Sequence, residues 1–378
     1  MAEIEIPFIK PVMPKSSDMA KDYEAIVDSN WFTNFGPFEN KFRHSAEDYL
    51  ANDTHVTTIA NATLGLDLSI RALINRDERA KEVIIPSFTF AAGAEVILSN
   101  GLTPVFIDID RDSLQPNIDE ARRYIETRRD SMAGILLCNI FGVGNQKIAE
   151  WEDLADEFNT PLIVDTAAGF GSRYSEDENV GSRGDCEVFS LHATKPFAVG
   201  EGGLVVSKNE DFIEKIRHLQ NFGFDASRQI ADIGTNAKLQ EVNCAIGLRQ
   251  IDGFADRLSN RQDTLRLYKE SLEPLGHVFQ PNDELSTVAF ASVITPSSEL
   301  GNSIHQNLQQ AGVEARRYYT PLHYQKSLST LALRASSLAV TEDIASRIIS
   351  LPVHDSMQES DIEKIISIFA EQSNEAKS

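Results

Sequence analysis

The sequence predicts an α/β protein in which helices cover both faces of a mainly parallel central sheet, followed by a smaller α+β C-terminal domain. Strand-like runs alternate with amphipathic helix-like stretches, the runs are apolar on both faces, and the composition changes late in the chain. At 378 residues the chain also exceeds the ~250–300 residues at which a single core usually stops growing. We expect an N-terminal segment and large domain over residues 1–250 and a small domain over residues 251–378.

The strand-like runs of the large domain are short and rich in β-branched or other apolar residues. They are Thr54–Ala60, Glu82–Ile85, Thr103–Ile109, Ala133–Ile140, Leu162–Val164, Glu187–Ser190 and Leu204–Ser207. The helix-like stretches between or after them are Thr63–Leu73, Ala91–Ser99, Ile118–Ile125, Ile148–Phe158 and Asp211–Leu219. Strands that are apolar on both faces and separated by helices indicate a parallel sheet covered on both sides.

The later part of the chain has a different pattern. One long helix is predicted over Leu239–Ala255, and it leads into the small domain. There the strand-like runs are Val288–Ile294 and Val313–Tyr318, and the helix-like stretches are Gly301–Gln310 and Ile362–Phe369. In the large domain, the polar stretch Ser175–Asn179 is predicted to be an exposed loop.

The formal net charge of −22 argues against a nucleic-acid or anionic-membrane partner, because such a surface would repel the chain. Any anionic ligand must therefore meet a local basic pocket. Three widely spaced cysteines are expected to be buried reduced thiols, and we predict neither a disulfide nor a metal site. The N-terminus lacks a signal-like apolar run, so we expect a soluble, cytoplasmic protein.

In open parallel sheets, ligands bind outside the carboxyl ends of the strands. The small-residue turn Asn61-Ala62-Thr63 opens a helix at the end of the first predicted strand. Free backbone N–H groups and the helix dipole can hold a phosphate at such a turn. Asn61 or Thr63 would also serve as an ordinary helix cap, so the turn alone leaves both interpretations open.

Two charged residues follow later strands. Asp165 ends the apolar run Leu162–Val164, where a carboxylate needs a cationic or hydrogen-bonding partner; a helix cap is the alternative. Lys195 lies between an apolar strand and a glycine-rich turn, where desolvation lowers the pKa of an amine, and Pro196 biases it away from helical geometry. A solvated surface lysine is the alternative. The combination of this lysine, the aspartate and the small-residue turn favours a functional site.

Motifs along nearly the whole chain resemble those of the DegT/DnrJ/EryC1/StrS family of aminotransferases, which depend on pyridoxal 5′-phosphate (PLP). The matching segments, in order, are Trp31–Pro37, Asn61–Thr63, Val83–Phe90, Pro104–Asp110, Asp165–Ala168, Ser190–Gly203, Gly234–Glu241 and Tyr319–His323. The resemblance implies the fold type I of PLP-dependent transferases, similar to aspartate aminotransferase. It also implies a homodimer whose two active sites are shared between the subunits.

By motif position, the resemblance implies that Lys195 binds PLP as a Schiff base and that Asp165 pairs with the protonated pyridine nitrogen. A protonated ring is an electron sink, and a carboxylate at the nitrogen keeps that proton in place. The amine of Lys195, once displaced by the amino donor, can move a proton between the reacting carbons. Both residues are therefore predicted to be catalytic.

The same resemblance implies the remaining cofactor contacts. Ala62 and Thr63 hold the phosphate, and Ser190 adds a second hydroxyl. Phe90 lies against the cofactor ring, although an ordinary core phenylalanine is the alternative. Asn236 of the neighbouring subunit completes the phosphate site, so an isologous dimer would be required for activity.

A sugar nucleotide needs local positive charge around its pyrophosphate. Four basic residues are the expected substrate contacts, although each by itself could be a surface residue. They are Lys238, Arg228, Arg316 and His323.

The chain departs from the family pattern at several positions. Ala168 replaces the usual glutamine or histidine, which removes the side chain near the phenolic oxygen of the cofactor. Asn61-Ala62-Thr63 stands for the commoner Ser-Gly-Thr, and Arg317-Tyr318 stands for Pro-His before Tyr319. Lys238 replaces an arginine, which exchanges a bidentate fork for a point charge. The residues around PLP are intact, but the family's sugar preferences do not transfer directly.

The resemblance implies an aminotransferase that moves an amino group from an amino acid, with glutamate first, to a nucleotide-linked keto sugar of a polysaccharide or O-antigen pathway. A 4-keto-6-deoxyhexose is the first choice and a 3-keto sugar an alternative. A PLP-dependent sugar dehydratase is another alternative, but such relatives carry histidine in place of the lysine, so Lys195 argues against it. A non-catalytic regulator with this fold would be favoured by loss of Lys195 or Asp165, and both are present.

Overall fold

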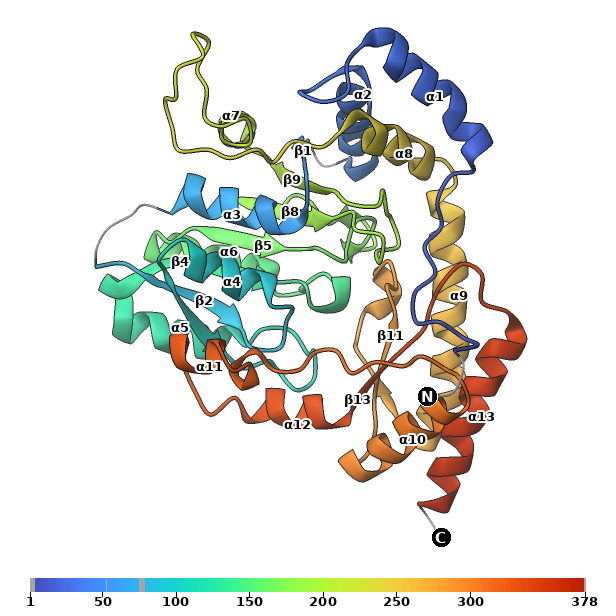
Figure 1. Cartoon of the computed structure of the whole chain (residues 1–378). Coiled ribbons are helices and arrows are strands. Elements are labelled where there is room, and N and C mark those ends of the chain that lie inside the picture. Colours follow the sequence, from blue (N-terminus) through green and yellow to red (C-terminus); the bar gives the residue numbers. More distant parts are fainter. Residues whose placement is uncertain (1–3, 52, 75–78, 377–378) are drawn as a thin grey trace.

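The computed structural model describes residues 4–51, 53–74 and 79–376 (Figure 1). Within these residues, eight strands form the central sheet in the order β1-β9-β8-β5-β4-β2-β3-β12. Their bounds are β1 (His55–Ile59), β2 (Glu82–Pro86), β3 (Thr103–Ile107), β4 (Met132–Cys138), β5 (Leu162–Asp165), β8 (Cys186–Ser190), β9 (Gly203–Ser207) and β12 (Leu333–Arg334).

Most neighbouring strands of this sheet are parallel, which confirms the predicted class. β8, β5, β4, β2, β3 and β12 pair in parallel, whereas β9 is antiparallel to both β8 and β1. The chain returns from β8 to β9 through a link without a helix, which is compatible with an antiparallel pair, while parallel neighbours need a crossover.

Helices cover both faces of the sheet. One apolar cluster joins it to α3 (Ala62–Leu73), α4 (Ala92–Ser99) and α7 (Glu210–Leu219). The other joins it to α2 (Pro37–Leu50), α5 (Ile118–Arg128) and α6 (Ile148–Phe158). Apart from the exposed edge strand β12, the strands are largely buried between these clusters, which explains why their sequences are apolar on both faces.

The long helix predicted over Leu239–Ala255 is wrong, because the chain forms two helices there. They are α8 (Glu241–Ile251) and α9 (Phe254–Leu272), and α1 (Ser16–Ser29) packs on the first of them. Between them Gly253 has a φ of 74°, which a residue with a side chain rarely adopts. The apolar pattern continues across this break, so periodicity alone did not reveal it.

A smaller antiparallel sheet has the order β10-β11-β13. Its strands are β10 (Val278–Phe279), β11 (Ala291–Ile294) and β13 (Ile348–Leu351), and the helices of this part of the chain are α9, α10 (Ser298–Gln310), α11 (Leu328–Leu331), α12 (Ala339–Arg347) and α13 (Glu359–Glu375). The strand predicted over Val288–Ile294 is therefore shorter than expected.

The strand predicted over Val313–Tyr318 is wrong, because this segment makes isolated bridges instead. Val313 bridges to Ile6 of the N-terminal segment, and Arg316 bridges to Ser350 of β13. The N-terminal segment thereby runs beside the small sheet, although it is distant in sequence (Figure 1). The division of the chain at residue 250 stays a prediction.

Three smaller expectations concern the surface and the core. The loop predicted over Ser175–Asn179 is the tip of a hairpin formed by β6 (Arg173–Ser175) and β7 (Glu178–Asn179). The three cysteines are buried, as predicted. None of the helices in the described part of the chain has the length and apolar character that a membrane span requires.

Candidate active site

A pocket of about 660 Å³ lies where β1, β2, β4, β5 and β8 end, at the carboxyl edge of the central sheet. Parallel strands bring the residues that follow them to one edge, so segments distant in sequence meet there. Six of the predicted site residues line this pocket, namely Ala62, Thr63, Phe90, Asp165, Ser190 and Lys195.

The turn after β1 is shaped by the start of α3. The side-chain oxygen of Asn61 accepts the N–H of Leu64 at 2.9 Å, so Asn61 is the helix cap. The N–H groups of Ala62 and Thr63 precede that bond in the first turn and have no acceptor among the described residues. A Cβ atom at Gly203 would lie only 2.9 Å from the nitrogen of Ala62. The glycine therefore lets β9 approach this turn closely.

Asp165, the last residue of β5, and Lys195, in the segment that follows β8, both line the pocket. Burial raises the pKa of Asp165, and the N–H of Ala167, at 3.0 Å, and the charge of Lys195 oppose that rise. Burial lowers the pKa of Lys195, whereas electrostatic interaction with Asp165 and Cys138 raises it. Neither the lysine nitrogen nor the second Asp165 oxygen has a hydrogen-bond partner within the described residues. Both groups are thus available to a ligand.

Aromatic side chains form much of the remaining wall. Phe90 is 63% exposed, so its ring is open to the pocket and is not the core phenylalanine of the alternative interpretation. Phe8, Phe290, Tyr318 and Tyr319 also line the pocket, and sequence reasoning did not select them. They come from the N-terminal segment and from the region around the small sheet; Tyr319 begins a segment that matches the family, but neither it nor the other three was predicted as a site residue.

The position at which the family usually carries glutamine or histidine also lies on the pocket wall. Ala168 lines the pocket, so this position offers a methyl group and no side-chain hydrogen bond. Its carbonyl oxygen accepts the Thr287 hydroxyl at 2.8 Å, which ties the turn after β5 to the segment before β11.

A buried hydrogen-bond network lies behind the pocket. Asn139 lines the pocket and donates to the Thr166 hydroxyl at 2.9 Å, and that hydroxyl donates to Glu187 at 2.6 Å. Burial raises the pKa of Glu187 to about 7, although Thr166 and the N–H groups of Gly181 and Arg183 oppose the rise. No sequence motif indicates this network, because Asn139 and Thr166 follow two different strands and Glu187 lies within a third, β8.

Three predicted site residues lie on the loop between α7 and α8, which extends away from the rest of the chain (Figure 1). Asn236 and Arg228 are exposed, and Lys238 is half-buried. The Lys238 amine donates to Asn221 at 2.9 Å and to Asn236 at 2.7 Å. None of the three lines the pocket of its own chain.

The other two predicted substrate contacts do not line the pocket either. Arg316 donates to the Tyr318 hydroxyl at 2.7 Å and pairs with Glu314. His323 is buried, with one ring nitrogen 2.7 Å from the Ser87 hydroxyl and the other 3.1 Å from Glu342. The imidazole thus fastens its own segment to the sheet.

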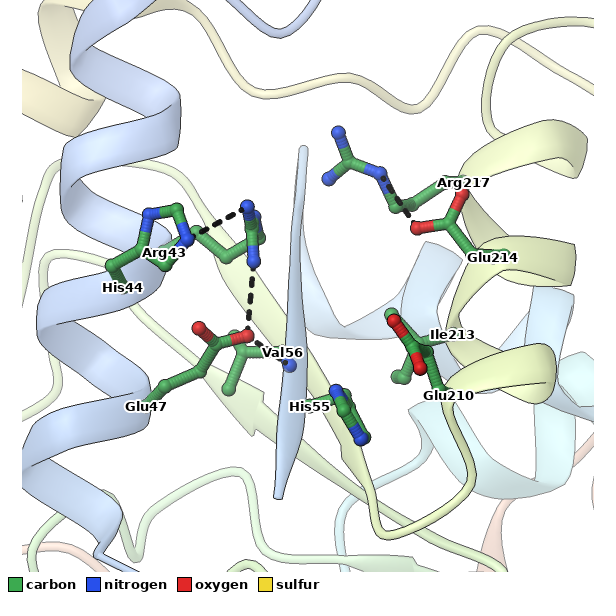
Figure 2. A pocket seen from close by; sticks show the side chains of 9 residues that line it. All are labelled: Arg43, His44, Glu47, His55, Val56, Glu210, Ile213, Glu214 and Arg217. Carbon is green, nitrogen blue, oxygen red and sulfur yellow. Dashed lines mark hydrogen bonds and ion pairs between the residues drawn. The ribbon is translucent and has the colours of Figure 1, made fainter. Parts of the chain in front are cut away.

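A second cavity, of about 350 Å³, lies between α2, β1 and α7 (Figure 2). Two ion pairs join charged side chains that line it: Arg43 pairs with Glu47 at 3.0 Å, and Arg217 with Glu214 at 3.6 Å. None of the predicted site residues lines it. The pocket at the strand ends is therefore the candidate active site.

The model of the DegT/DnrJ/EryC1/StrS aminotransferase family matches residues 15–370. The chain is 43% identical over 370 residues to Protein Rv3402c of Mycobacterium tuberculosis, covering 97% of this chain and 90% of that protein. It is 29% identical over 369 residues to dTDP-4-amino-4,6-dideoxy-D-glucose transaminase of Shigella dysenteriae, covering 96% of this chain and 97% of that protein.

A crystal structure from Bacillus cereus ATCC 10987, described as that of a candidate PLP-dependent aminotransferase, matches with a TM-score of 0.91 and 31% identity. The match covers 97% of this chain and 99% of that chain, and it confirms the predicted fold. These similarities show that the chain belongs to the DegT/DnrJ/EryC1/StrS aminotransferase family and is a PLP-dependent aminotransferase.

Proposed function

We propose that this enzyme transfers an amino group from an amino acid, with glutamate first, to a nucleotide-linked keto sugar, with a 4-keto-6-deoxyhexose first. The observation that carries the proposal is the single pocket that joins Lys195, Asp165 and the turn at the start of α3. The similarity to the Shigella transaminase of a dTDP-linked amino sugar supports the class of acceptor.

The chemistry of the pocket fits PLP. The free N–H groups of Ala62 and Thr63, with the hydroxyls of Thr63 and Ser190, suit a phosphate at a helix N-terminus. Asp165 is 5% exposed and has an oxygen without a hydrogen-bond partner among the described residues, which suits a protonated ring nitrogen. The exposed ring of Phe90 suits a flat aromatic ligand.

When bound, PLP supplies an electron sink that lets a substrate carbon lose its proton. Asp165 would hold the proton on the ring nitrogen, because a buried carboxylate beside a cation favours the charged form of that cation. The Lys195 amine, whose pKa burial lowers, would remove the proton from one reacting carbon and deliver it to the next. One lysine thus binds the cofactor and moves the proton.

Asn236, Lys238 and Arg228 would complete the pocket of a second subunit. Asn236 and Arg228 are exposed, Lys238 is half-buried, and none of the three lines the pocket of its own chain. The loop that carries them exposes Ile230 and Ile233, which are 68% and 79% exposed and would be covered in an isologous dimer. Lys238 and Arg228 would then face the pyrophosphate of the sugar nucleotide, and we propose no substrate contact for His323.

Subunit complementation tests the shared site. We expect the Lys195→Ala and Asn236→Ala chains to have little or no aminotransferase activity when each is tested alone. Mixed dimers of the two chains are prepared by refolding or co-expression. If Asn236 serves the partner's pocket, each mixed dimer contains one intact site and recovers up to about half of the wild-type activity per dimer. If both residues serve the same chain's pocket, no mixed dimer contains an intact site and activity does not recover.

The reaction itself is tested with purified enzyme, glutamate and dTDP-linked or GDP-linked keto sugars. The proposal predicts 2-oxoglutarate and an amino sugar in equal amounts, with none formed by Lys195→Ala. A sugar that loses water without gaining nitrogen would indicate dehydration, and amination of a 3-keto sugar would indicate that alternative. No turnover across the set would overturn the proposed acceptor class.

A further inference from the structure

Tyr318 is held on the pocket wall by aromatic neighbours. Its ring centroid lies 5.7 Å from that of Phe8, 5.4 Å from that of Phe290 and 5.5 Å from that of Tyr319. The backbone just before Tyr318 is anchored as well, because Arg316 and Ser350 exchange two backbone hydrogen bonds, of 3.0 and 2.7 Å. The direction of the Tyr318 hydroxyl is therefore set before any substrate enters.

The hydroxyl receives a hydrogen bond from a charged group. The Arg316 Nη1 atom donates to the Tyr318 oxygen at 2.7 Å. The rest of that guanidinium is occupied by Glu314, which accepts from Nη2 at 2.7 Å and from Nε at 3.2 Å. The second Glu314 oxygen accepts the N–H of Phe8 at 2.9 Å. Arg316 is thus turned toward Tyr318 and is neutralised by Glu314, so it is poorly placed to hold a pyrophosphate.

An oxygen that accepts a bond from a guanidinium becomes a stronger donor through its own hydrogen. Among the residues that the structure describes, no acceptor takes the hydrogen of Tyr318, and its side chain lines the pocket. The neighbouring wall, formed by Phe8, Ile9, Ala289 and Phe290, offers apolar side chains. A polarised donor beside apolar side chains is an arrangement that orients a polar ligand.

We propose that Tyr318 donates a hydrogen bond to a hydroxyl oxygen of the acceptor sugar, and that Arg316 and Glu314 are positioning residues that act through it. This inference rests on the proposed function, because it needs a sugar acceptor in the pocket. It replaces the direct substrate contact that the sequence predicted for Arg316.

The first test removes only the hydroxyl. Tyr318→Phe keeps the ring and its packing, and we expect kcat/KM for the keto sugar nucleotide to fall about tenfold, as for one lost hydrogen bond. A series of deoxy analogues then locates the bond: the wild type should lose about tenfold with the analogue that lacks the contacted oxygen, and Tyr318→Phe should lose nothing further with it. Tyr324→Phe, which alters a tyrosine outside the pocket, is the matched control.

The second test separates positioning from folding. Arg316→Gln should lower kcat/KM for the same substrate, and the double variant with Tyr318→Phe should be no worse than Tyr318→Phe alone, because Arg316 acts through the hydroxyl. Additive losses, cofactor release from Tyr318→Phe, or unchanged discrimination against every deoxy analogue would overturn the inference while the wild type still aminates the sugar. Absence of turnover by the wild type would instead remove the proposed function on which it rests.

Discussion

The pocket has two halves that are built in different ways. The half that we assign to the cofactor comes from residues at or shortly after the carboxyl ends of strands of the central sheet, such as Thr63, Asp165 and Ser190. The acceptor half comes from Phe8 near the N-terminus and from Phe290 and Tyr318 near the small sheet. The first half has polar groups that can bind a ligand, whereas the second has aromatic rings around the Tyr318 hydroxyl, which Arg316 orients. In our proposal, residues at the ends of the sheet strands carry the chemistry, and segments that pack against the sheet select the substrate.

Lys195→Ala should give the largest effect, because it removes both the attachment of the cofactor and the proton carrier. We expect kcat to fall by more than about 10⁴-fold, measured as 2-oxoglutarate formation from glutamate. The exposed Lys208→Ala serves as the control. Residual activity within about tenfold of the wild type would contradict the role that we assign to Lys195.

Asp165→Asn should follow, because an amide of the same shape cannot hold a proton on the ring nitrogen. We expect kcat to fall about 10²–10³-fold while the cofactor stays bound, which absorbance and activity together would show. Asp177→Asn, at an exposed hairpin tip, is the matched control. An unchanged kcat would mean that the carboxylate has only a structural role.

Glu187→Gln should change the pH dependence of stability behind the cofactor half. The pKa of the buried carboxyl rises from 4.5 to about 7 on folding, so the folded state favours the protonated form. Its contribution is therefore greatest below pH 4.5 and is lost as the pH rises through 7, a change of about 3 kcal/mol. Urea unfolding from pH 4 to 8 should show a smaller decline for Glu187→Gln than for the wild type or the exposed Glu126→Gln.

If the wild type and Glu187→Gln lose stability equally over that range, the carboxyl does not titrate as proposed.

Phe90→Ala should give the smallest effect, because the ring is exposed and adds only a stacking contact of about 1 kcal/mol. We expect the affinity for PLP to weaken about 3–10-fold, while the unfolding free energy of the cofactor-free protein changes little. Destabilisation of the cofactor-free protein by several kcal/mol would instead identify Phe90 as a core residue.

The contrast between the two halves also explains what the sequence could predict. The parallel sheet, its helices and the six residues of the cofactor half follow from short motifs, because each residue lies just after a strand. Phe8 and Tyr318 reach the pocket through contacts with partners far away in sequence, which periodicity does not encode. The break at Gly253 was missed because the apolar pattern continues across it, although the pair Asp252-Gly253 is typical of a turn and the φ of Gly253 confirms one.

The central claim is that the pocket at the strand ends holds PLP through Lys195. Borohydride reduction of the purified enzyme, followed by digestion and mass spectrometry, tests it most directly. We expect one reduced cofactor per chain on the peptide that contains Lys195, and none in the Lys195→Ala variant. A cofactor fixed to another lysine, or no cofactor on that peptide, would contradict it.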